Sequence, residues 1–78
     1  MTTMREILAE VASRTGVDER ELVSPNRCRV VAQARAEAMH LMRLAGRSTT
    51  QIGRFLNRDH STVAVMSNRH AARMQDGA

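Results

Sequence analysis

The chain of 78 residues lacks several features that mark common classes of protein. It contains no Lys, and all twelve of its basic residues are Arg. The absence of Lys excludes a Walker-type phosphate loop, whose motif requires that residue, and it excludes Schiff-base catalysis. Since there is a single Cys, no disulfide can form within the chain, and the sequence shows no sign of an oxidising compartment.

Long apolar runs and aromatic side chains are also scarce. No apolar run approaches the roughly 20 residues of a membrane span, and the first residues lack the apolar segment of a signal peptide. We therefore expect a cytoplasmic, nucleoid-associated protein. Phe55 is the only aromatic residue, so the core must consist of aliphatic side chains and Met. We expect residues 1–78 to form a single domain.

Charge is distributed unevenly along the chain. Residues 1–23 carry a net charge of −2, whereas residues 24–78 carry a net charge of +6. A basic part beside an acidic part indicates one face suited to a polyanion and another face turned away from it. The excess of Arg fits such a partner, because a guanidinium group binds phosphate and guanine bidentately.

The hydrophobic pattern predicts an all-α fold of four to five helices with one long central helix. Thr3 and Glu6 have the spacing of a capping box, which predicts a first helix over about residues 4–14. Residues 18–21 are predicted to make a single helical turn. A long helix is then expected from about residue 27 to 45, where apolar residues recur every three or four positions.

The last part of the chain has the pattern of two helices joined by a tight turn. Ser48 and Gln51 form a second capping-box match at the start of a short helix. Asn57 suits the turn because Asn tolerates left-handed backbone, and Asp59 suits the N-cap of the last helix. Residues 75–78 are expected to be a disordered tail.

Two short helices joined in this way follow the plan of a helix-turn-helix bundle. The first turn of the second helix contacts bases in such proteins, and here it reads Asp59, His60, Ser61 and Thr62, preceded by Arg58. A carboxylate can accept from cytosine, hydroxyls can donate or accept, and an arginine can bind guanine or phosphate. We predict that these five residues contact DNA, although the carboxylate could instead cap the helix.

Catalysis and metal binding are not expected. Asp59, His60 and Ser61 are the residue types of a catalytic triad, but consecutive helical residues fan out by about 100° and cannot line up. The three His residues and Cys28 lack the spacing of metal ligands. We therefore predict a protein that is not an enzyme and has no cofactor, no metal and no small-molecule substrate.

The stretch from Ile52 to Val63 resembles the signature of the C-terminal DNA-binding domain of the bacterial replication initiator DnaA, a Trp-repressor-like helix-turn-helix. Residues 27–31 and 35–41 are similar to the basic loop and the long helix of that domain. The resemblance covers roughly residues 4–74. One departure is a turn shortened by one residue, in which we expect Asn57 to carry the turn.

The resemblance implies binding to short duplex sequence elements. It implies that the signature helix enters the major groove and that an arginine of the basic loop, Arg27 or its rival Arg29, enters the adjacent minor groove. Some residues of this sequence match positions of that domain that are basic or contact the DNA backbone. The resemblance therefore implies a further set of contacts to the DNA backbone: Arg35, Arg43, Arg47 and Ser48.

The ATPase motor of the initiator has no counterpart in the sequence, so we expect a stand-alone bacterial or phage module. The first expectation is a transcription regulator acting with a protein partner such as a sigma-like factor, RNA polymerase or a replication initiator. One alternative is a modulator of replication initiation that binds origin DNA. Another is a protein-interaction adaptor that docks a partner through the first helix and the acidic residues 18–21.

Overall fold

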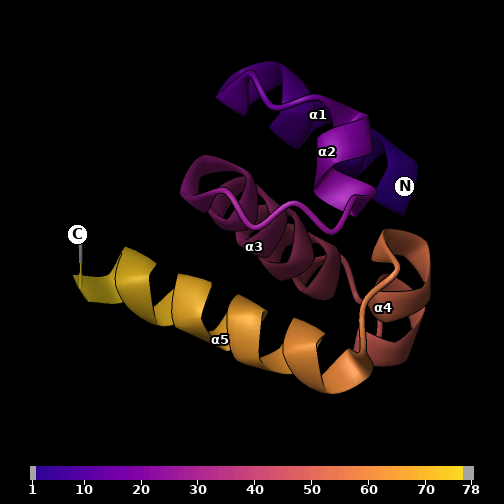
Figure 1. Cartoon of the computed structure of the whole chain (residues 1–78). Helices are drawn as coiled ribbons and strands as arrows, with labels where there is room; N and C mark the ends of the chain where they lie inside the picture. Colours follow the sequence, from indigo (N-terminus) through magenta and orange to yellow (C-terminus); the bar gives the residue numbers. More distant parts are fainter. Residues whose placement is uncertain (1, 77–78) are drawn as a thin grey trace.

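The computed structural model describes the backbone of residues 2–76 and the side chains of residues 2–74. Its helices are α1 (Met4–Thr15), α2 (Glu19–Val23), α3 (Arg29–Leu44), α4 (Thr49–Leu56) and α5 (His60–Asp76). The long helix α3 runs through the middle, with α1 and α2 on one side, α5 along another side and α4 at one end (Figure 1). The all-α prediction with a long central helix is confirmed.

Both predicted capping boxes are present. In α1 the backbone N–H of Glu6 donates to Thr3 Oγ1 at 3.1 Å, and the backbone N–H of Thr3 donates to Glu6 Oε1 at 3.2 Å. In α4, Ser48 and Gln51 make the same reciprocal pair at 3.1 and 2.9 Å. Each pair satisfies two backbone donors that a helix start otherwise leaves unpaired, so both helix starts are encoded locally.

Several helix boundaries differ from the prediction by one or two residues. The long helix begins at Arg29 rather than about residue 27, because the preceding segment folds into side-chain-supported turns. In that segment Ser24 Oγ accepts from the backbone N–H of Asn26 at 3.2 Å, and Asn26 Oδ1 accepts from that of Cys28 at 2.8 Å. Such Asx-type and Ser-type turns compete with helix. At the other end α5 continues two residues into the tail expected over 75–78, and residues 77–78 lie outside the described residues.

The core is aliphatic and contains Met, as the lack of aromatics requires. Its largest fully buried side chains include Leu22, Met39, Met42 and Leu56, which come from α2, α3 and α4. Phe55 is only half-buried and packs against this cluster. At the end of α4, next to the turn, the fully buried side chain is therefore the aliphatic Leu56 and not the neighbouring Phe55.

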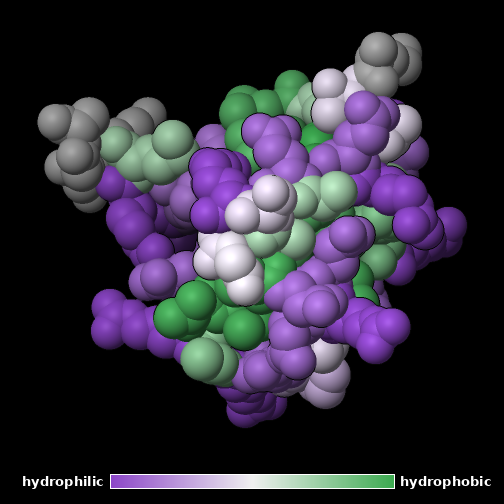
Figure 2. All heavy atoms as spheres, turned by 90° about the horizontal axis from the view of Figure 1, so that it is seen from above, coloured by the Kyte–Doolittle hydropathy of each residue, from purple (hydrophilic) through white to green (hydrophobic). Residues whose placement is uncertain are grey.

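On the face seen in Figure 2, hydrophilic side chains cover most of the surface, and patches of apolar side chains lie between them. Among the described residues the large apolar side chains that are exposed are Val30, Leu44, Val65 and Met74. No helix within residues 2–76 is both long and apolar enough to cross a membrane. The acidic residues 1–23 contain α1 and α2, and the basic residues 24–78 contain the remaining described helices.

Two histidines meet where α3 packs against α5. The ring centroids of His40 and His70 are 5.3 Å apart, and His70 Nδ1 is buried without a hydrogen-bond partner in the described part of the chain. Burial is the main cause that lowers the pKa of His70 below its ordinary value of 6.5, and the charge of His40 lowers it further. Glu37 opposes this shift, while Arg73 and Arg14 add to it. The fold therefore favours the neutral imidazole.

Stability is expected to fall in mild acid because of this histidine. In the unfolded chain His70 takes up a proton near pH 6.5, whereas the folded chain takes it up only at lower pH. The free energy of unfolding therefore decreases as the pH drops from about 7 through the folded-state pKa. Urea unfolding across that range measures the effect. In His70→Leu the decrease should be smaller, and identical curves for the two chains would contradict this assignment.

Candidate nucleic-acid interface

The turn between α4 and α5 is closed by a glycine that has no room for a side chain. The backbone N–H of Arg58 donates to the carbonyl of Gly53 at 2.7 Å. A Cβ atom at Gly53 would lie 2.5 Å from the carbonyl oxygen of Arg58. Asn57 takes the left-handed conformation with φ of 58°, as predicted for the shortened turn. Close backbone approach and one left-handed residue together set the angle between the two helices.

The first turn of α5 presents polar side chains to solvent. Asp59 Oδ1 accepts from the backbone N–H of Ser61 at 2.7 Å, which confirms the predicted N-cap and lowers the pKa of the carboxyl group. His60, Ser61 and Thr62 are exposed. The carboxylate lies 3.7 Å from His60 Nδ1, so an acid, a hydroxyl pair and an imidazole stand together at the helix start.

Arg58 points back into the protein rather than outward. Its Nη1 atom donates to the carbonyls of Leu56 and Asn57 at 3.3 and 3.1 Å, and its Nη2 atom donates to the carbonyl of Ser24. The residue is half-buried. The predicted base contact is thus replaced in this structure by a bond that fastens the turn to the loop of residues 24–28.

Arg35 corrects the prediction of a contact to the DNA backbone. Only 4% of the residue is exposed. Its Nε donates to the carbonyl of Leu22 at 2.8 Å, and its Nη2 donates to those of Glu21 and Ser24, both at 2.9 Å. Burial lowers the pKa of Arg35, and the charge of Arg58 adds to that shift, but a guanidinium remains protonated. Its donors are occupied inside the fold, so it is not available to a phosphate.

Three other residues were predicted to contact the DNA backbone, and they differ in how far the protein itself occupies their side chains. Arg43 is exposed, but its Nη1 donates to Ser67 Oγ and Asn68 Oδ1 at 2.9 and 3.1 Å, which ties α3 to α5. Arg47 is half-buried, and within the described chain its Nε has no partner. Ser48 is exposed and caps α4, as shown above.

The basic loop and the first residue of α3 carry free arginines. Arg27 and Arg29 are exposed, and the loop is held to the turn of the helix-turn-helix because the Ser24 carbonyl accepts from both Arg35 and Arg58. Cys28, in the same loop, is exposed. The loop and the turn before the start of α5 are therefore joined by hydrogen bonds at the Ser24 carbonyl.

The family to which the chain belongs follows from these elements and from its sequence. Residues 4–69 match the family model described as the helix-turn-helix of the bacterial DnaA protein. The chain belongs to the DnaA helix-turn-helix family. It is a DNA-binding domain. In helix-turn-helix domains in general the first turn of the second helix faces DNA, and in this chain that turn, at the start of α5, is exposed and polar.

Two curated relatives of the DnaA family are similar to the chain. It is 41% identical over 63 residues to the chromosomal replication initiator protein DnaA of Jannaschia sp. (strain CCS1), which covers 78% of this chain and 13% of that protein. It is 41% identical over 69 residues to the DnaA protein of Gluconobacter oxydans (strain 621H), covering 86% of this chain and 14% of that protein. The chain thus spans about one seventh of these relatives. No solved structure matches it significantly.

Arg54 is a basic residue beside the turn that was not predicted as a site residue. Arg54 is exposed on α4 and lines, with Asp59 and His60, an open hollow of about 510 Å³ beside the turn. A signal was available, because Thr50 and Arg54 are four residues apart and share the polar face of a short helix. In the part of the chain that the structure describes, no three His, Cys, Asp or Glu side chains gather into a possible metal site.

Proposed function

We propose that this domain binds specific sequences in double-stranded DNA, with the first turn of α5 in the major groove and the loop arginines in the adjacent minor groove. The observation that carries this proposal is the shared Ser24 carbonyl, which holds the basic loop beside the start of α5 through Arg35 and Arg58. A fixed spacing between the two contacts suits simultaneous entry into neighbouring grooves. His60, Ser61 and Thr62 are exposed, as base contacts require.

We further propose that the target is a replication-type element, such as those of an origin, rather than a promoter. The sequence favoured a transcription regulator with a protein partner, and that role stays a prediction. Both relatives are named as chromosomal replication initiator proteins, which supports the replication alternative. The domain is proposed to be non-enzymatic, since Asp59 serves as the cap of α5 and its neighbours point to solvent.

Selection from a pool of random duplexes tests the specificity. The expected result is a short shared motif that the chain also protects in footprinting of genomic DNA, with the motif enriched near the replication origin. Uniform weak binding without a protected motif would contradict sequence-specific binding. Enrichment at scattered promoters, with none at the origin, would contradict the replication target and support the regulator.

The substitution Asp59→Asn distinguishes the role of this side chain as a helix cap from a role in contacting a base. Asn caps a helix as well as Asp does, so the stability of the domain should not change. A carboxylate accepts from cytosine, whereas an amide pairs with adenine. We expect the preferred base at one position to shift from cytosine toward adenine, with a change in discrimination of about 1–3 kcal/mol. Selected motifs and titrations on paired duplexes measure this shift.

The matched control for this substitution is Asp18→Asn. Asp18 caps α2 in the same way, with its Oδ1 accepting from the backbone N–H of Arg20 at 2.8 Å. It lies in the acidic part of the chain, so its replacement should leave the selected motif unchanged. If Asp59→Asn also leaves the motif unchanged, the carboxylate at position 59 is only a cap.

A further inference from the structure

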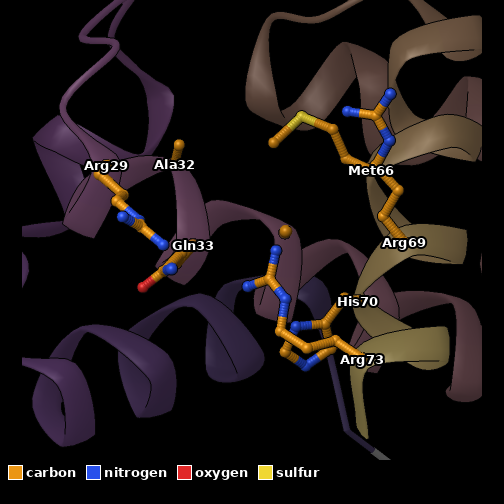
Figure 3. Close-up of a pocket in the computed structure, with 8 residues that line it drawn as sticks. Arg29, Ala32, Gln33, Met66, Arg69, His70 and Arg73 are labelled. Atoms are coloured by element: carbon orange, nitrogen blue, oxygen red, sulfur yellow. The ribbon is translucent and has the colours of Figure 1, made fainter. Parts of the chain in front are cut away.

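A cleft separates the first half of α3 from the second half of α5. It has a volume of about 240 Å³, and its apolar lining residues are Ala32, Ala36 and Met66. Figure 3 shows Arg29 and Gln33 on the α3 wall facing Met66, His70 and Arg73 on the α5 wall. Arg69 also lines the cleft. The cleft is therefore framed by arginines from two helices.

The positive charge of this cleft is not neutralised by the protein. None of the residues that line it is acidic, and within the described side chains Arg29, Arg69 and Arg73 take part in no ion pair. Glu37, the only acid on α3, is paired with Arg14 at 2.5 Å. Three free guanidinium groups around one depression concentrate positive potential there, and each has the fork geometry that binds a phosphate bidentately.

We propose that this cleft binds the phosphate backbone of DNA on the flank of the base pairs that the first turn of α5 reads. The inference rests on the proposed function. Arg29 follows the basic loop directly, so a duplex that reaches the loop arginines passes the mouth of the cleft. The domain then contacts DNA at three places, which are the turn of α5, the loop and the cleft.

Along α5 the cleft arginines are well separated from the first turn, which is proposed to read bases. Arg69 lies nine residues after His60, which is about 13 Å along a helix that rises 1.5 Å per residue. Arg69 and Arg73 stand one helical turn apart and can each bind one phosphate.

The test is the salt dependence of binding by a variant that carries both Arg69→Ala and Arg73→Ala. Each lost phosphate contact reduces the slope of log affinity against log salt by about 0.9. Raising the salt from 50 to 200 mM should therefore weaken the double variant about 12-fold less than it weakens the unaltered domain. The selected motif should stay the same, because backbone contacts carry no base preference.

Two further variants sharpen the measurement. Arg73→Lys keeps the charge and should keep the slope. Arg5→Ala removes an exposed arginine from α1, which bears no part of the proposed interface, and should change neither the slope nor the motif. Urea unfolding is expected to show the same stability for all of these exposed-site variants.

Failure of this proposal is distinguishable from failure of the proposed function. If the unaltered domain shows no motif, sequence-specific binding is wrong. If it shows the motif but the double variant keeps the full slope, the cleft does not bind DNA. A double variant that loses the motif would also overturn the backbone assignment. Pyrophosphate binding to the unaltered domain and to the double variant can be measured by calorimetry. If the double variant loses pyrophosphate binding but binds DNA as the unaltered domain does, the backbone assignment is also overturned, and the cleft is a site for free phosphate compounds.

Discussion

Arg35→Ala is expected to destabilise the domain by about 3 kcal/mol, because a buried group left without its hydrogen-bond partner costs about 1–3 kcal/mol and several bonds are lost together. The guanidinium bonds the carbonyls of Glu21, Leu22 and Ser24, and the residue is 4% exposed. A domain of this size has a total stability of roughly 4–12 kcal/mol, so the loss is a large part of the whole. The urea midpoint of unfolding measures it.

This result separates the two roles considered for Arg35. A contact to the DNA backbone would leave stability unchanged and reduce the salt slope of DNA binding by about 0.9. Arg29→Ala is the control, because Arg29 is exposed on the same helix, and its loss should change stability by no more than about 0.5 kcal/mol. Arg35→Lys should restore little, since an ammonium group cannot reproduce the fork of donors. Unchanged stability of Arg35→Ala would contradict the structural role.

Gly53→Ala is expected to cost about 3 kcal/mol, at the upper end of what overpacking causes, and to abolish specific binding. The new Cβ would lie 2.5 Å from the Arg58 carbonyl oxygen and 3.5 Å from the backbone nitrogen of His60. Both neighbours are backbone atoms of the turn, which can move only if the first turn of α5 moves with them. The melting temperature should fall by about 4–8 °C for each kcal/mol lost.

Gly16→Ala is the matched control for that substitution. Gly16 ends α1 with φ of 77°, and no atom lies within 4 Å of the position its Cβ would take. The cost is then only that of left-handed backbone, about 1–2 kcal/mol. DNA binding of the folded protein should be retained. If Gly53→Ala retains the motif and the melting temperature of the unaltered chain, the close approach does not set the turn.

The features predicted correctly from the sequence are those in which the interacting residues are near neighbours along the chain. The capping boxes join residues three apart, Asp59 caps the N–H two residues on, and Asn57 turns the chain by its own backbone preference. The helix start at residue 27 was wrong because Asn26 and Ser24 favour local turns over helix. The place of Arg69 and Arg73 in the cleft was not predicted, because that requires knowledge of which helix faces are covered.

The amino-acid sequence by itself determined the all-α fold, the helix-turn-helix and the family, because capping, periodicity and the signature around Asp59 act over short stretches. Only the tertiary structure decided which arginines are free to meet DNA. Arg35 bonds carbonyls 11 to 14 residues away, and Arg58 bonds one 34 residues away. All twelve arginines share one chemistry. Whether each binds the fold or a phosphate depends on burial and on unpaired carbonyls that packing brings within its reach.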